Sequence, residues 1–264
     1  KVGYSANADN QSAGKEYIMA FPRGTVLNTD ALLPLDRLSD MHIEIYLSTG
    51  KEALLNPTGS DASFSLSDIE LHANYLSSAS ISRYFSTNGV KFHVADISHR
   101  FNNVQAQTSL LKFSSAHSSL NKIVTILRAD IDYTNNPTLL ERLVRGVSGE
   151  DIASYQLFVN TRRFFDEDVD STEQSWRHFV SAYPSICQSP WWDIEFATSK
   201  HVIVNNLQAA PPKFSTSITS GIQTSALNND ISLEIKFNSP PGASTQADSF
   251  LISDALITVQ PGKS

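Results

Sequence analysis

Three aspartates at alternate positions are the first residues in this sequence whose type and spacing could do chemistry. Asp166, Asp168 and Asp170 have the spacing of the first three ligands in a calcium-binding hand. Such a loop continues with glycine and glutamate where this chain has Ser171 and Arg177. We therefore expect an acidic surface loop whose negative charge stabilises the N-terminus of a following helix. A calcium ion held loosely between subunits is the alternative.

The histidines and the cysteine show little sign of a metal or catalytic site. His93 and His99 are six residues apart with Asp96 between them, but alternation places His93 on a polar face and no further ligand is close in sequence. Cys187 has no catalytic signature around it and is expected to be a buried thiol. We interpret the remaining histidines as surface or interface residues: His42, His72, His117, His178 and His201.

Two adjacent tryptophans are candidates for an interface or for sugar stacking. Trp191 and Trp192 precede Asp193, and an exposed tryptophan beside a carboxylate can stack against a sugar ring. The alternative, which we favour, is that both indoles pack under a helix predicted over residues 172–183. The sequence contains no HExxH, CxxC or GxSxG motif and no phosphate-binding glycine loop. No catalytic residue and no cofactor are therefore predicted.

The elements that must position these residues are mostly strands. Alternation of apolar and polar residues predicts half-buried strands at several places along the chain. Two further segments, 123–127 and 251–259, are apolar on both faces and indicate strands that lie between layers. The alternating segments are residues 16–21, 42–47, 69–75, 90–94, 155–160 and 231–237.

Short helices are predicted between the strands. One is capped by Asn136 and ends at Gly146, and another begins after Ser171, which forms a capping box with Gln174. Residues 80–85 are a weaker third candidate. Many strands, few helices and no βαβ alternation predict an all-β sandwich with short helices in its loops.

Composition limits the classes of protein. Of 264 residues, 41% are hydrophobic, which is enough for a sizeable core, and only 18% are charged. The net charge is −7 and no basic run occurs, so direct contact with nucleic acid is not expected. A single cysteine excludes an internal disulfide, and the apolar runs are shorter than a membrane span. Because the chain starts at Lys1 without methionine, we expect a true start further upstream.

Several segments, taken in order, resemble the second half of a double jelly-roll major capsid protein of a tailless icosahedral virus (PRD1/adenovirus-like lineage). The first resembles the end of the first jelly roll, the second the opening strand of the second roll, and the last two its closing pair. In the usual place of a "YP…P" motif this chain has Arg162–Phe165 and an acidic run. The resembling segments are residues 31–48, 64–69, 119–128, 154–160, 221–224 and 250–259.

This resemblance implies a jelly-roll β-sandwich, as a double jelly roll or most of one. Residues 1–52 would then be the closing strands of a first roll or an N-terminal arm, and residues 60–264 a C-terminal jelly roll. The alternative is two compact rolls divided near residues 135–150. The implied protein is a structural coat subunit of the virion, assembled inside the host cell. It forms trimeric capsomers of an icosahedral shell.

The resemblance also implies the partners of the chain. These are copies of itself within the trimer, neighbouring capsomers, and penton or minor capsid proteins, without direct contact to nucleic acid. Two other classes of protein share the sandwich and stay open: a jelly-roll lectin and, less favoured, a glycoside-active enzyme. The fold alone does not distinguish the coat subunit, the lectin and the enzyme, so their behaviour in solution must distinguish them.

Overall fold

The computed structural model describes residues 32–35, 42–45, 65, 67–74, 76–114, 116–128, 151–183, 196, 201–208, 221–224, 230–241 and 245–260. The chain divides into two compact units. The first consists of Lys1–Phe92, Pro137–Leu139 and Ile257–Ser264, and the second of His93–Asn136 and Leu140–Leu256. Within the described residues, no helix is both long and apolar enough to cross a membrane.

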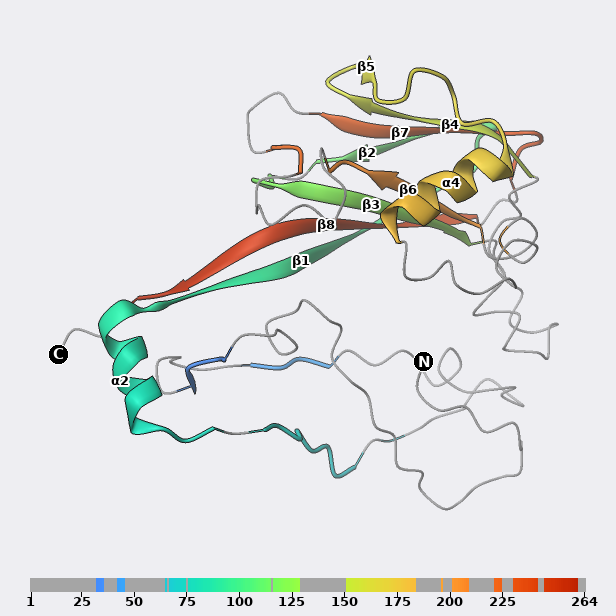
Figure 1. The fold of residues 1–264 in the computed structure, drawn as a ribbon. Helices are drawn as coiled ribbons and strands as arrows, with labels where there is room; N and C mark the ends of the chain where they lie inside the picture. The colour runs from blue at the N-terminus through green and yellow to red at the C-terminus, as the bar shows by residue number, and fades with distance from the viewer. Residues whose placement is uncertain are drawn as a thin grey trace. The chain divides into compact units, whose positions relative to one another are not determined.

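The described strands form two four-stranded sheets, which Figure 1 shows as two layers. In the first sheet the order is β1 (Val90–Asn103), β8 (Gln246–Val259), β3 (Leu120–Arg128) and β6 (Val202–Asn206). In the second sheet the order is β2 (Thr108–Phe113), β7 (Ile231–Phe237), β4 (Ile152–Val159) and β5 (Arg162–Arg163).

This strand order is that of a jelly roll. The first strand pairs with the eighth, the second with the seventh, the third with the sixth and the fourth with the fifth. The chain therefore forms nested pairs of strands, and successive pairs are wound into two facing sheets. The pairs β2–β7, β3–β6, β4–β5, β3–β8 and β4–β7 are all antiparallel. The predicted all-β jelly-roll class is confirmed.

The core lies between the inner faces of the two sheets. Strand β7 shows the reason most clearly, because each of its apolar residues is buried and each residue between them is half-buried. Alternation of this kind follows from the pleat, which turns successive side chains to opposite faces. Side chains from both sheets meet in one cluster, which includes Leu111, Ile123, Leu127, Tyr155, Leu157, Ile203, Leu233, Ile235 and Leu251.

A tight hairpin connects β4 to β5. Val159 pairs with Arg162, so only Asn160 and Thr161 form the turn. Both have positive φ, 53° and 65°, which is the pattern of the hairpin turn that matches strand twist. The Asn160 side chain accepts a hydrogen bond from the backbone N–H of Asp230 at 3.0 Å, which fixes this turn against the residue before β7.

The strand predictions are confirmed for segments 90–94, 123–127, 155–159, 231–237 and 251–259. Two strand predictions are wrong where the structure can be compared with them. Residues 42–45 and 69–74 have no regular structure and are exposed. The segment 64–69, which resembles an opening strand, likewise has none at its described residues, and the roll opens with β1 instead. Segment 16–21 lies outside the described residues.

These errors have one physical cause. Alternation reports that a segment suits a half-buried pleated surface, but a strand also needs a second strand to supply its backbone hydrogen bonds.

Conversely, β2 and β6 were not predicted at all. In β6 the residues Ile203, Val204 and Asn205 are all buried, so the strand shows no apolar and polar alternation.

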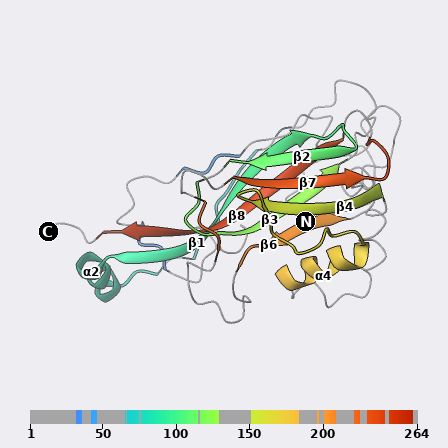
Figure 2. The same cartoon turned by 90° about the horizontal axis from the view of Figure 1, so that it is seen from above.

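Two of the predicted helices are present. The weak candidate at 80–85 corresponds to α2 (Ala79–Asn88), and the helix after Ser171 is α4 (Thr172–Ala182). The Ser171 side chain accepts from the backbone N–H of Gln174 at 3.2 Å, as the capping box requires. Figure 2 shows α4 beside β6, at the edge of the first sheet. The helix predicted from Asn136 to Gly146 lies outside the described residues.

Candidate functional site

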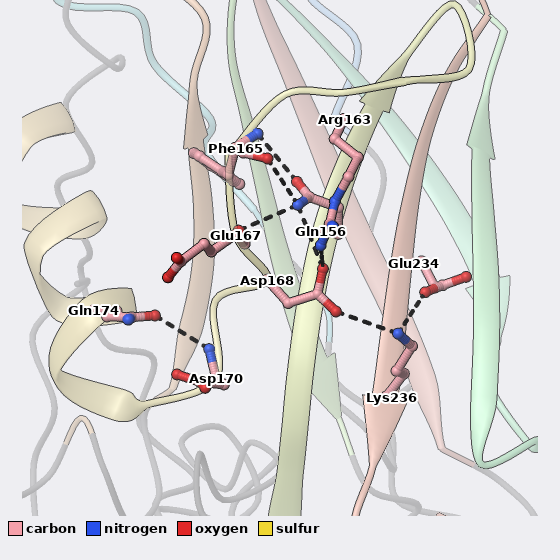
Figure 3. Close-up of polar contacts among 9 residues, drawn as sticks. All are labelled: Gln156, Arg163, Phe165, Glu167, Asp168, Asp170, Gln174, Glu234 and Lys236. Carbon is pink, nitrogen blue, oxygen red and sulfur yellow. Dashed lines mark hydrogen bonds and ion pairs between the residues drawn. The ribbon is translucent and has the colours of Figure 1, made fainter.

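The acidic run belongs to a loop that follows β5 and is held against β4 by the side chain of Gln156 and by two backbone hydrogen bonds between Tyr155 and Val169. Gln156 lies on the outer face of β4 and is only 1% exposed. Its Nε2 donates to the backbone carbonyls of Phe165 at 3.0 Å and Glu167 at 3.2 Å, and its Oε1 accepts from the Phe165 N–H at 3.1 Å (Figure 3). The amide thus satisfies three backbone groups that the loop would otherwise leave without partners.

Asp168 is the centre of a charge network on the same face. Its carboxylate accepts from Lys236 Nζ at 3.3 Å and forms an ion pair with Arg163, while Lys236 also lies 3.1 Å from Glu234 (Figure 3). Burial opposes ionisation of Asp168, but the hydrogen bonds and charges of Lys236 and Arg163 outweigh it and hold the pKa of this carboxyl below its ordinary value. Glu234 and Asp168 together raise the pKa of Lys236.

The three aspartates, which were candidates for the alternative calcium site, are therefore placed differently from one another. Asp168 is turned towards two cations, whereas Asp166 and Asp170 are exposed. The backbone N–H of Asp170 donates to the side chain of Gln174 at 3.2 Å, so this residue belongs to the start of α4. Across the described residues, no three His, Cys, Asp or Glu side chains lie close enough together to hold a metal ion. The arrangement fastens the loop to the sheet and pairs the charge of Asp168 with Arg163 and Lys236.

Trp191 and Trp192, together with Cys187, lie outside the described residues. Their roles at an interface, in sugar stacking or in packing stay predictions. His93 and His99 are both on β1, which is described. Six residues of an extended strand span about 20 Å, so these two imidazoles cannot share a metal ion.

A second group of residues, on the outer face of the first sheet, was missed by sequence reasoning. Asp248 of β8 lies 2.7 Å from His99 Nε2 and 2.5 Å from Arg128, and its side chain is only 9% exposed. The ring of His99 stacks on Phe250 with centroids 4.9 Å apart. The contact between His99 and Asp248 joins residues 149 positions apart, and no local sequence pattern signals such a pair.

Apolar side chains surround this group. Ile97 and Phe101 are 48% and 50% exposed, and each is two residues from His99 along β1. Strand alternation therefore places both on the face that carries His99. We call Ile97, His99, Phe101, Asp248 and Phe250 the β1–β8 patch. Its only acid, Asp248, is already in contact with His99 of β1 and with the guanidinium of Arg128 of β3.

The order and pairing of the eight described strands define a jelly-roll β-sandwich. Among solved structures this chain is similar to the quasi-atomic capsid model of the PBCV-1 virus, with 10% identity and a TM-score of 0.47. It is also similar to PBCV-1 VP54 fitted into a reconstruction of the virophage Sputnik, with 11% identity and a TM-score of 0.47. Each match covers 70% of this chain and 53% of the other, so the chain spans about half the length of these structures. No family model and no curated protein matches the sequence.

Proposed function

We propose that this chain is a structural coat subunit of a virus. It assembles with copies of itself as trimeric capsomers, which then form an icosahedral shell. The virion is its location, and neighbouring capsomers and penton or minor capsid proteins are its further partners. The observation that carries the proposal is the complete jelly-roll strand order, combined with the positions of the resembling sequence segments within it.

Three of these segments fall on strands in the order that the resemblance requires, whereas segment 64–69 has no regular structure at its described residues. Residues 119–128 contain β3, residues 154–160 contain most of β4, and residues 250–259 lie in β8. The 221–224 segment forms a bridge from Ile222 to Leu120 at the start of β3. Agreement in order along the chain and in position within the roll supports the coat proposal more strongly than any segment alone.

The β1–β8 patch supplies a surface suited to subunit contact. Stable protein interfaces bury about 800 Å² on each partner and are enriched in aromatic residues. Phe101 and Ile97 offer apolar area, and burial of Asp248 is already compensated by His99 and Arg128. Removing this face from water would therefore leave no unpaired acid behind. We propose that the patch contacts a neighbouring copy of the chain.

The experiment is the native mass of the purified protein by light scattering, with negative-stain images of the same sample. Stable trimers or shell-like particles are expected. The double variant Ile97→Asp, Phe101→Asp should shift the mass towards the monomer while the circular dichroism spectrum stays unchanged. The control is Leu110→Asp, which places one such carboxylate on a similarly exposed leucine of β2, in the other sheet.

Different results remove different parts of the proposal. A wild-type protein that stays monomeric at high concentration contradicts the coat function, and a glycan array would then test the lectin alternative. Dissociation by Leu110→Asp but not by the double variant leaves the coat function standing. It places the subunit contact elsewhere than the β1–β8 patch.

A further inference from the structure

A buried chain of hydrogen bonds joins α4 to both sheets. The phenol of Tyr155, on β4, donates to Ser175 Oγ on α4 at 3.2 Å. Ser175 Oγ in turn lies 2.9 Å from Nε2 of His201, the residue before β6. All three side chains are buried, and the ring of His201 packs against Phe196 with centroids 4.9 Å apart.

The geometry assigns a neutral imidazole to His201. When Tyr155 donates to Ser175, the serine hydroxyl hydrogen needs an acceptor of its own, and His201 Nε2 is the acceptor within reach. If Nε2 carried a proton, it would be a donor that faces Ser175 Oγ. The hydroxyl hydrogen of Ser175 would then have lost its acceptor. Water cannot replace that acceptor, because the site is closed to solvent.

Within the part of the chain that the structure describes, no nearby charge compensates a proton at this position. The elements that pack here carry Glu173, Arg177 and His178 on α4 and Lys122 on β3. The Lys122 ammonium is already used, since it donates to the Ala182 carbonyl at 2.8 Å and lies over the Tyr183 ring. Burial lowers the pKa of His201 to about 4.

The side chains that hold α4 form a cluster separate from the main core. Phe179 and Ala182 pack with Phe196 and Val204, and Trp176 stacks on Phe179 with centroids 5.5 Å apart. The residues between the two sheets form the other cluster. Elements held by a small separate cluster can open while the main core stays folded.

We propose that His201 is an acid-sensitive latch for α4: proton uptake at Nε2 breaks the Tyr155–Ser175–His201 chain and releases α4 from the edge of the sandwich, while the two sheets stay paired. The latch is a property of the fold and does not depend on the coat function. Acid would thereby expose the aromatic residues Trp176 and Phe179, which α4 otherwise turns towards the sheet.

The test is hydrogen exchange of the full chain at pH 7.5 and pH 5, read by mass spectrometry and corrected for the chemical exchange rate at each pH. The equilibrium constant for opening of α4 should rise about 30-fold from pH 7.5 to pH 5, because His201 takes up a proton with an ordinary histidine pKa once α4 is open. Peptides from β7 should show no comparable change. Parallel loss of protection in α4 and β7 would overturn the proposal.

Two variants separate the latch from general acid effects. In His201→Gln, an uncharged side chain replaces the imidazole, and the rise in α4 opening between pH 7.5 and pH 5 should be largely lost. The control His93→Gln changes an exposed histidine of β1 and should keep the wild-type response. An unchanged response in His201→Gln rejects the latch. If that variant does not fold, the midpoint of His201 in the wild-type protein is measured by NMR, and a value at or above about 6.5 rejects it equally.

Discussion

Asp248 of β8 and Arg128 of β3 form an ion pair across adjacent strands, with 2.5 Å between carboxylate and guanidinium. Asp248 lies directly opposite Ile126, so Arg128 reaches it along the diagonal of the antiparallel ladder. The other carboxylate oxygen is 2.7 Å from His99 of β1. One nearly buried acid therefore links three neighbouring strands of the first sheet.

Replacing Asp248 by asparagine should destabilise the protein by about 1.5–3 kcal/mol, because hydrogen bonds to a charged group contribute about that much. Urea unfolding measures the change as a lower midpoint with an unchanged slope. The control Asp96→Asn removes an exposed carboxylate from β1 and should change stability by less than about 0.5 kcal/mol. Equal effects of the two variants would show that the link between strands contributes nothing.

Gln156 gives the second prediction. The variant Gln156→Leu keeps much of the side-chain volume but removes the partners of the Phe165 N–H and of two loop carbonyls. Each unsatisfied buried group costs about 1–3 kcal/mol, so a loss of roughly 3 kcal/mol is expected. The loop should also become accessible, and trypsin should cleave after Arg163 at a dilution that leaves the wild type intact.

The matched control is Gln107→Leu. Gln107 is exposed, and its side chain donates one long hydrogen bond of 3.4 Å to the Asn238 carbonyl. Its replacement should leave both the urea midpoint and the rate of tryptic cleavage near the wild-type values. Slow cleavage of Gln156→Leu, at the wild-type rate, would mean that other contacts hold the loop.

Local signals predicted part of this fold. The helix at α4 was predicted because its cap and its apolar stripe lie within a dozen residues, and β7 because its alternation is regular. The division into residues 1–52 and 60–264 and the roles of Trp191 and Trp192 stay predictions.

Long-range pairs account for what sequence reasoning missed. The partners of His99 and His201 depend on which elements the roll brings together, and alternation carries no information about strand order. His99 was considered beside His93 because they are close in sequence, whereas its actual partner is on β8. Asp168 was considered beside two other acids, whereas it binds cations from β5 and β7.

Stability should fall in acid because of His201. Burial lowers the pKa of this imidazole from 6.5 to about 4, so the unfolded chain takes up a proton first as pH falls. The contribution of His201 is therefore complete above pH 6.5 and is lost progressively as pH falls towards 4, by about 3 kcal/mol in all. Urea unfolding at pH 7.5, 5.5 and 4.5 measures this loss.

In His201→Gln the pH dependence over the same interval should be flatter by most of that amount. The control His72→Gln alters a histidine whose side chain is 85% exposed, and its curve should match the wild type. A wild-type slope in His201→Gln would assign the acid sensitivity to other groups.

The N-terminus of α4 supplies a last test, on the link between the acidic loop and the helix. Ser171 caps the helix by accepting from the Gln174 N–H, and the Gln174 side-chain oxygen accepts from the Asp170 N–H. Ser171→Ala should cost about 1 kcal/mol, whereas Ser171→Gly should cost only a few tenths, since glycine is itself tolerated at this position. Because the two hydrogen bonds support each other, the effects of Ser171→Ala and Gln174→Ala should be less than additive. Strictly additive shifts of the urea midpoint would mean that the Ser171 cap and the hydrogen bond between Asp170 and Gln174 act independently. Asp170 would then be positioned by the loop alone.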